Sequence, residues 1–80
     1  MNWEIIEGKY QCELGFDSQS KLGEFVHALT KLSDELNHHA DMEIRFCTLF
    51  ISLHSHDVNL ITQRDHDWVE RAKKLWKYIH

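Results

Sequence analysis

The sequence predicts an α+β domain in which a four-stranded antiparallel sheet carries two helices on one face, in the order β-β-α-β-β-α. Apolar and polar residues alternate in two separate parts of the chain, which is the period of a half-buried strand. Two other stretches repeat apolar residues every three or four positions, which is the period of an amphipathic helix. With no proline and only three glycines, nothing divides residues 1–80 into more than a single domain.

The first half of the predicted sheet is a hairpin of residues 2–6 and 9–16, with a turn at Gly8. The second of these strands has one apolar face, because its apolar residues occupy alternate positions. These residues are Tyr10, Cys12, Leu14 and Phe16. The hairpin therefore has one face to bury and one to expose.

A helix is predicted over about residues 18–37, with Asp17 or Ser18 as its N-cap. Its apolar residues recur at spacings of three and four and form one stripe. They are Leu22, Phe25, Val26, Leu29, Leu32 and Leu36. The end of this helix brings the chain to two adjacent histidines, His38 and His39.

The second hairpin is predicted from a change of parity. Apolar residues alternate over residues 42–46 and again, at opposite positions, over 49–53. A tight turn at residues 47–48 accounts for the change. The last strand is predicted to continue as far as His56, so that His54 and His56 project on the same side.

A second helix follows a short loop. Thr62 and Asp65 resemble a capping box, with Asp in place of the usual Glu or Gln. The predicted buried stripe of this helix consists of Trp68, Ala72, Leu75, Trp76 and Ile79. Two helices cover only one face of the sheet, so an unpaired edge strand favours a homo-oligomer.

Composition excludes several classes of protein. The net charge is −4 and the lysines are dispersed, which argues against direct nucleic-acid binding. Cys12 and Cys47 lack the spacing of a redox or disulfide motif, so reduced thiols in the cytoplasm are expected. No leader and no apolar run of about 18 residues is present, so neither secretion nor membrane insertion is expected.

Histidine is the one residue type in clear excess, with seven in 80 residues. Adjacent side chains can serve one pocket only where regular structure ends, and the pair His38-His39 lies at such a helix-to-strand junction. Because imidazole both gives and takes protons near neutral pH, the pair is a candidate acid/base centre. The alternative is a solvated helix end that carries two polar residues.

Other interpretations of the histidines stay open. His54 and His56 could form half of a zinc site, but the sequence has no HExxH motif and no cysteine pair, so no metal is expected. A Cys-His nucleophile is a weaker interpretation, because Cys47 falls in the predicted turn and Cys12 in an apolar stripe. Some histidines can be half-buried structural residues, and the candidates are His27, His54, His66 and His80.

Six positions over about 32 residues resemble the signature of the pterin-4a-carbinolamine dehydratases, in which a His-His-Pro is followed by an aromatic residue, a third histidine and an aspartate. These positions are Asp34, His38, His39, Phe46, His56 and Asp65. Ala40 stands where the family usually has proline, and Met42 where many members have tryptophan. Alanine at position 40 is expected to let the helix extend forward by a residue or two.

The resemblance implies the fold predicted above, with subunits that join their sheets in a homodimer and sometimes pair again in a homotetramer. It also implies a reaction, the loss of water from a 4a-hydroxytetrahydropterin to give quinonoid dihydropterin. This step regenerates a tetrahydrobiopterin-type cofactor after the hydroxylation of aromatic amino acids. The family uses a small-molecule pterin as substrate and needs no metal or organic cofactor.

The reaction needs an acid that protonates the departing hydroxyl and a base that takes a proton from a ring nitrogen. The resemblance assigns these tasks to His38, His39 and His56, without deciding which is the acid and which the base.

Four further residues are candidates for substrate binding or support. Asp34 and Asp57 could each orient a neighbouring imidazole. Asp65 opens the second helix, so a capping role is at least as good an interpretation as a catalytic one. Phe46 is predicted to pack in the core, because an apolar residue at strand periodicity is more often buried than in contact with substrate.

Two other functions remain as alternatives. The same fold could serve as a non-catalytic dimerisation module or transcription cofactor, which an exposed apolar patch on the helix of Trp68 and Trp76 would indicate. It could also bind another pterin in molybdopterin metabolism. Genomic neighbourhood would separate these alternatives.

Overall fold

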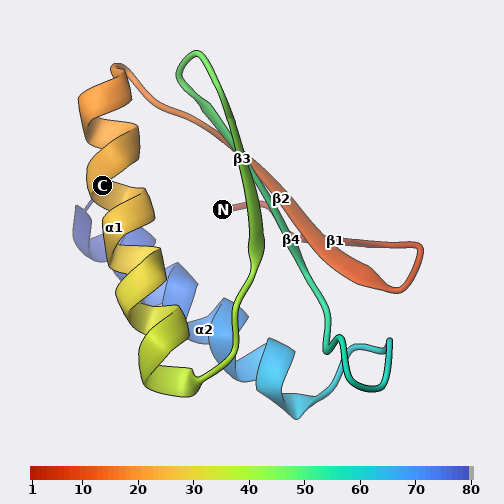
Figure 1. Ribbon diagram of the computed structural model, residues 1–80. Coiled ribbons are helices and arrows are strands. Elements are labelled where there is room, and N and C mark those ends of the chain that lie inside the picture. The colour runs from red at the N-terminus through yellow and green to blue at the C-terminus, as the bar shows by residue number, and fades with distance from the viewer. Residues whose placement is uncertain (80) are drawn as a thin grey trace.

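The computed structural model describes residues 1–79, and His80 lies outside the described residues. It confirms the predicted fold class, with a four-stranded antiparallel sheet and two helices on one side of it (Figure 1). The elements are β1 (Glu4–Ile6), β2 (Lys9–Gly15), α1 (Gln19–Leu36), β3 (Asp41–Arg45), β4 (Thr48–Leu53) and α2 (Gln63–Ile79).

The strands lie in the order β1-β2-β4-β3, so β2 and β4 are central and β1 and β3 form the two edges. In the register of the central pair, Cys12 lies opposite Ile51 and Leu14 lies opposite Leu49. These four side chains are buried and form the floor on which the helices pack. The predicted apolar face of the second strand is therefore confirmed.

Trp68 and Phe25 are the largest fully buried side chains and join the two helices to the sheet. The indole Nε1 of Trp68 donates a hydrogen bond to the Ser33 hydroxyl at 3.1 Å, and that hydroxyl donates to the Leu29 carbonyl at 2.9 Å. Because an unpaired buried donor is costly, this relay lets α2 place an indole against α1. Trp68 thus lies inside the core and contributes nothing to an exposed patch.

The predicted stripe of α1 is buried or packs against the core along its length. Ser18 caps the helix, because its hydroxyl accepts a hydrogen bond from the Lys21 N–H at 3.2 Å. In α2 the stripe is confirmed through Trp76, which packs against the core. The prediction for Ile79 is wrong, since this residue lies one turn beyond the last packed position and is exposed.

The second hairpin turns at residues 46–47, one position earlier than predicted. Phe46 adopts φ 53°, as a tight two-residue hairpin turn requires. Its side chain is 89% exposed, so the prediction that Phe46 packs in the core is wrong. The turn geometry overrides the apolar periodicity at this position.

β4 ends at Leu53, so the prediction of a strand that continues to His56 is also wrong. The Ser55 N–H donates to the Leu60 carbonyl at 2.9 Å, which closes a small loop over residues 56–59. The chain reaches α2 through this loop. Within residues 1–79, neither helix combines the length and apolar content that crossing a bilayer requires.

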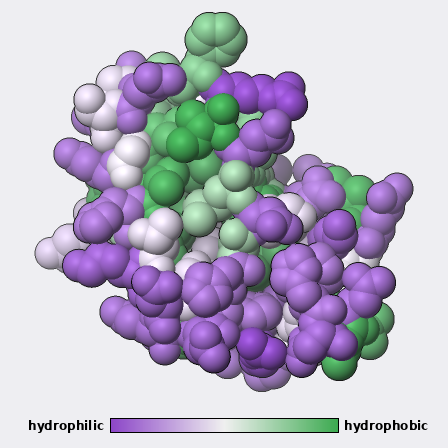
Figure 2. All heavy atoms as spheres, viewed as in Figure 1, coloured by the Kyte–Doolittle hydropathy of each residue, from purple (hydrophilic) through white to green (hydrophobic). Residues whose placement is uncertain are grey.

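The surface between α1 and the β3–β4 hairpin carries an apolar strip with hydrophilic side chains around it (Figure 2). Ile44 of the edge strand β3 and Phe46 of its turn are both exposed. On the other edge, Ile5 and Ile6 of β1 are exposed as well. Both edges of the sheet therefore offer apolar side chains beside unpaired backbone groups.

Candidate active site

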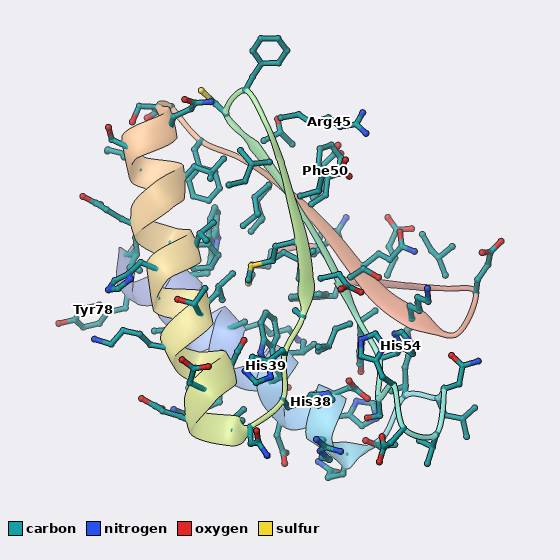
Figure 3. All side chains as sticks on the ribbon, in the orientation of Figure 1. His38, His39, Arg45, Phe50, His54 and Tyr78 are labelled. Atoms are coloured by element: carbon teal, nitrogen blue, oxygen red, sulfur yellow. The ribbon has the colours of Figure 1, made fainter. Side chains whose placement is uncertain are left out.

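The three histidines that the sequence singles out line one hollow of about 400 Å³. Its walls come from the segment between α1 and β3, from the loop after β4 and from the first turn of α2 (Figure 3). The lining residues are Asn37, His38, His39, Ala40, Asp41, His56, Asp57 and Arg64. A hollow of this size falls in the range of small-molecule sites.

A Schellman motif at the end of α1 fixes the backbone of His38. Asn37 adopts a left-handed conformation with φ 49° and ψ 44°. The Asn37 N–H donates to the Asp34 carbonyl at 3.2 Å, and the His38 N–H donates to the Ser33 carbonyl at 3.0 Å. The helix therefore stops at Leu36, and the expectation that Ala40 lets it extend forward is wrong.

His38 and Asp65 form a buried pair. Their side chains are 5% and 0% exposed, and His38 Nε2 lies 2.6 Å from Asp65 Oδ1. The other carboxylate oxygen accepts hydrogen bonds from the Thr62 N–H and the Ser55 hydroxyl, each at 2.8 Å. Every polar group that faces this carboxylate is therefore a donor.

The environment of Asp65 keeps it ionised. Burial by itself would raise the pKa of this carboxyl, but the hydrogen bonds from His38, Thr62 and Ser55 outweigh burial and lower the pKa below its ordinary value. Because an ionised carboxylate only accepts hydrogen bonds, His38 donates through Nε2–H. This arrangement fixes the tautomer and leaves Nδ1 of His38 as the basic nitrogen.

Asp65 contacts both the start of α2 and an imidazole of the hollow. Its bond from the Thr62 N–H is the carboxylate half of a capping box, so the predicted cap of α2 is confirmed. The same side chain holds His38. One carboxylate can make both contacts, because Oδ1 faces His38 and Oδ2 accepts from Thr62.

His39 lies at the exposed rim of the hollow, and its Nε2 is 3.0 Å from Asp34 Oδ1. An exposed pair of this kind adds little stability, but it restricts the orientation of the ring. Asp34 therefore lies beside an imidazole, as the sequence suggested. His56 faces Asp41, with 4.0 Å between Nε2 and Oδ2, which is too long for a hydrogen bond.

Asp57 lies against Arg64 and bonds no imidazole of residues 1–79. Its carboxylate lies 3.7 Å from Arg64 Nη1, and the other arm of Arg64 donates to the Asn37 carbonyl at 3.2 Å. Arg64 thus links the loop after β4 to the end of α1. Sequence reasoning missed Arg64 and Asp41. Arg64 directly precedes Asp65 of the matched signature, and Asp41 directly follows Ala40.

Phe46 does not line the hollow. It lies in the β3–β4 turn, at the opposite end of β3 from Asp41 (Figure 1). The matched spacing therefore combines residues of the hollow with one residue at the far end of the sheet.

Among residues 1–79, no three histidine, cysteine or acidic side chains gather closely enough to hold a metal ion. His54 and His56 lie together, with ring centroids 4.3 Å apart, but no third ligand of this kind joins them. Burial raises the pKa of the Cys12 thiol, which disfavours the thiolate that metals and electrophiles require.

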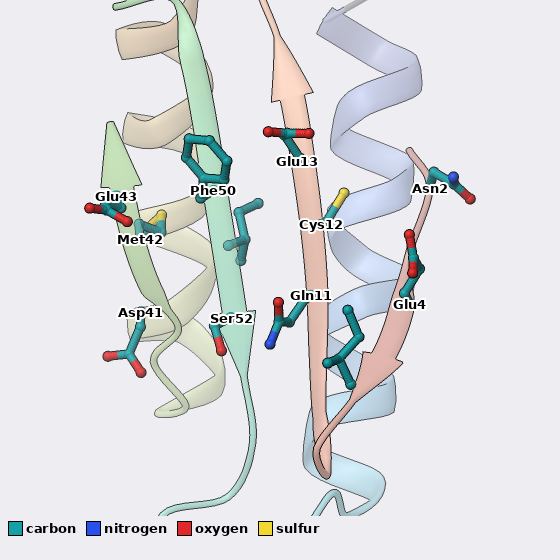
Figure 4. A pocket seen from close by; sticks show the side chains of 12 residues that line it. Asn2, Glu4, Gln11, Cys12, Glu13, Asp41, Met42, Glu43, Phe50 and Ser52 are labelled. Atoms are coloured by element: carbon teal, nitrogen blue, oxygen red, sulfur yellow. The ribbon is translucent and has the colours of Figure 1, made fainter. Parts of the chain in front are cut away.

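A larger hollow of about 580 Å³ lies on the open face of the sheet (Figure 4). Its walls carry carboxylates and an aromatic ring but no histidine, and they include Glu4, Glu13, Glu43 and Phe50. Because the smaller hollow is lined by three histidines and the larger one by none, the smaller hollow is the better candidate for acid/base chemistry.

A family model described as pterin 4 alpha carbinolamine dehydratase matches residues 1–75 of the chain. A protein of Herpetosiphon aurantiacus with the name "Putative pterin-4-alpha-carbinolamine dehydratase" is 32% identical over 74 residues, which are 92% of this chain and 77% of the relative. A protein of the same name from Nostoc punctiforme is 31% identical over 73 residues, which are 91% of this chain and 78% of the relative.

Two solved structures share the fold. The crystal structure of a transcriptional coactivator/pterin dehydratase from Brucella melitensis superposes with a TM-score of 0.86 at 16% identity, over 91% of this chain and 80% of that one. A pterin dehydratase-like protein identified as a RuBisCO assembly factor in the alpha-carboxysome gives a TM-score of 0.73 at 17% identity, over 92% and 86% of the two chains.

Proposed function

The chain belongs to the pterin-4a-carbinolamine dehydratase family, and we propose that it dehydrates a 4a-hydroxytetrahydropterin to quinonoid dihydropterin by histidine acid/base catalysis. The bond between C4a and oxygen breaks, and a double bond forms between C4a and the adjacent ring nitrogen. The hydroxyl takes one proton and leaves as water, while the ring nitrogen gives up one proton. One acid and one base therefore balance the reaction.

His38 is the base in this proposal. Its Nε2–H is held by the ionised Asp65 at 2.6 Å, which leaves Nδ1 as the nitrogen that can accept a proton in a side chain that lines the hollow. When Nδ1 takes the ring proton, the imidazolium that forms lies against a carboxylate, and this contact stabilises the charge. This buried pair is the observation that carries the proposal.

His56 is the acid. Its Nε2 stops 4.0 Å short of Asp41, so no hydrogen bond to a carboxylate ties up that nitrogen. His39 Nε2 is engaged by Asp34 at 3.0 Å, so His39 is assigned to binding and orienting the pterin. Asp34, Asp57 and Asp41 support these side chains, and Phe46 has no direct part.

The test is a dehydration assay on the purified protein with a 4a-hydroxytetrahydropterin. His38→Ala should lower kcat by ~10²–10⁴-fold, the usual contribution of a positioned proton transfer. His27→Ala is the matched control, because His27 is exposed on α1 and lies outside the hollow. Wild-type protein without activity, or a His38→Ala variant as fast as wild type, would reject the assignment.

A binding module is the second candidate function. The observation that favours it is a hollow between the outer faces of α1 and α2, where Ala28, Leu32 and Leu75 form an apolar floor. The Brucella protein is described as a transcriptional coactivator as well as a pterin dehydratase. An inactive wild-type protein that still binds a macromolecular partner through this helical face would support the second candidate.

A further inference from the structure

His54 lies beside the hollow but has no part in the chemistry above. It directly follows β4 and is 6% exposed (Figure 3). Its Nδ1 is buried and has no hydrogen-bond partner among residues 1–79. Buried polar atoms are normally hydrogen-bonded, and this one is not. A hydrogen bond from Nδ1 therefore does not explain why a histidine occupies this position.

The ring of His54 lies against the ring of His56. The two ring centroids are 4.3 Å apart, and the ring planes are inclined by 58°. Ser55, between them, is fully buried, and its N–H and hydroxyl are bonded to Leu60 and Asp65. The backbone that carries both rings is therefore fixed, and the ring of His54 forms one wall against which His56 rests.

His56 would be loosely held without this wall, because its side chain is 64% exposed. Asp41 Oδ2 is 4.0 Å from His56 Nε2, and a modest rotation of the ring would close this gap to the ~2.8 Å of a charge-assisted hydrogen bond. A His56 ring bonded to Asp41 would have its Nε2 occupied by that carboxylate, as His39 Nε2 is by Asp34. The observed separation must be maintained by other contacts.

We propose that His54 is a positioning residue, whose ring holds His56 at the wall of the hollow with Nε2 out of hydrogen-bonding range of Asp41. The catalytic part of this inference depends on the function proposed above, since it takes His56 to be the acid. The flat ring of His54 provides the support, and its nitrogens are not required.

The other charged groups around His56 are already paired. Asp34 bonds His39, Asp65 bonds His38, and Asp57 lies against Arg64. Asp41 on β3 is the carboxylate of the hollow whose ion pair is with His56 itself. Movement of His56 toward a carboxylate would therefore be movement toward Asp41, and it would favour the protonated imidazole.

The experiment follows the His56 ring resonances by NMR through a pH titration. His54→Ala should move the His56 titration midpoint upward by on the order of 0.5 pH unit, because the freed ring reaches Asp41. His54→Phe keeps a flat ring without nitrogen and should leave the midpoint near that of wild type. The double variant His54→Ala/Asp41→Asn should lose the upward shift, and His27→Ala should show none.

Catalysis gives a second measurement. His54→Ala should lower kcat about tenfold with little change in KM, since the ground-state contacts of the pterin are kept while its acid is misplaced. His54→Phe should restore most of kcat. If His54→Ala gives no folded amide spectrum, His54→Val replaces it, because valine retains more buried apolar area.

The inference is overturned if the midpoint stays fixed in His54→Ala, if it moves equally in His54→Phe, or if the shift survives Asp41→Asn. These NMR results need no substrate. A wild-type protein that shows the predicted shifts but no dehydration would reject the proposed function and leave the support of His56 by His54 intact. Dehydration without the shifts would reject only the role of His54.

Discussion

Asp65 combines a helix cap with the hydrogen bond that holds His38. Its two oxygens accept hydrogen bonds from a cap, a hydroxyl and an imidazole, all in a fully buried position. Removing the charge leaves these donors facing a weaker or misdirected acceptor. Asp65→Asn should lower the free energy of unfolding by about 2 kcal/mol or more at neutral pH and should also slow the proposed reaction.

The pH dependence of stability has a definite sign at Asp65. The folded-state pKa lies below its ordinary value, so the stabilisation is present above the unfolded pKa of about 3.9 and disappears as pH falls through the folded pKa. Urea unfolding between pH 7 and pH 3 should show a steeper acid loss in wild type than in Asp65→Asn. Parallel curves for the two proteins would contradict the account of this carboxylate.

Ala40 offers a second test at the residue scale. Its φ is not positive, and its N–H takes no part in the backbone hydrogen bonds outside the helices and strands of residues 1–79. Proline also requires φ near −65°, and with that φ at position 40 Ala40→Pro should stabilise the fold by about 0.4–1 kcal/mol by restricting the unfolded chain. The dehydration rate should hold or rise, and paired thermal melts and assays measure both effects. A less stable and slower variant would mean that the backbone at this position cannot accept proline.

At the scale of elements, the end of α1 decides where His38 points. Asn37 holds the left-handed conformation that lets the His38 N–H reach the Ser33 carbonyl. Asn37→Ala should cost about 1 kcal/mol and lower kcat, because an ordinary side chain is strained there. Asn37→Gly should match or exceed wild-type stability in denaturant melts. Equal stability of the two variants would show that the motif does not control the helix end.

The sequence predicted the elements well and their ends less well. Periodicity located β2, β3, β4 and both helices, whereas β1, whose three residues are all exposed, was located from the turn at Gly8. It failed at Phe46 and after Leu53, where tight turns and a single backbone bridge decide the path. Such local geometry leaves no trace in the apolar pattern.

The candidate site was predictable only in part, because the contacts of its side chains also depend on the folded path of the chain. His38, His39 and His56 were identified from spacing, and all three line the hollow. The partners of these side chains depend on which of several acidic residues the folded chain brings near. Asp41 and Arg64 reach the hollow from a strand start and a helix start, so neither shows a distinctive pattern in the sequence.

At the scale of the whole molecule, the two edge strands remain open. Exposed Ile5 on β1 and Ile44 on β3 lie beside unpaired backbone groups. We expect light scattering at micromolar concentration to show at least a dimer, formed by pairing at one edge. Ile5→Lys and Ile44→Lys should identify that edge, because only one of them should yield monomers. A wild-type monomer would contradict the shared sheet.

The relay through Ser33 gives the molecule an optical reporter of its own site. The Ser33 carbonyl anchors the His38 amide, while its hydroxyl accepts from the Trp68 indole. Indole emission is sensitive to hydrogen bonding and to water, and Trp68 is fully buried. Loosening of the backbone at His38 should therefore appear as a change in the fluorescence of Trp68. The conformation of this wall of the hollow can then be followed by intrinsic fluorescence without a label or a substrate.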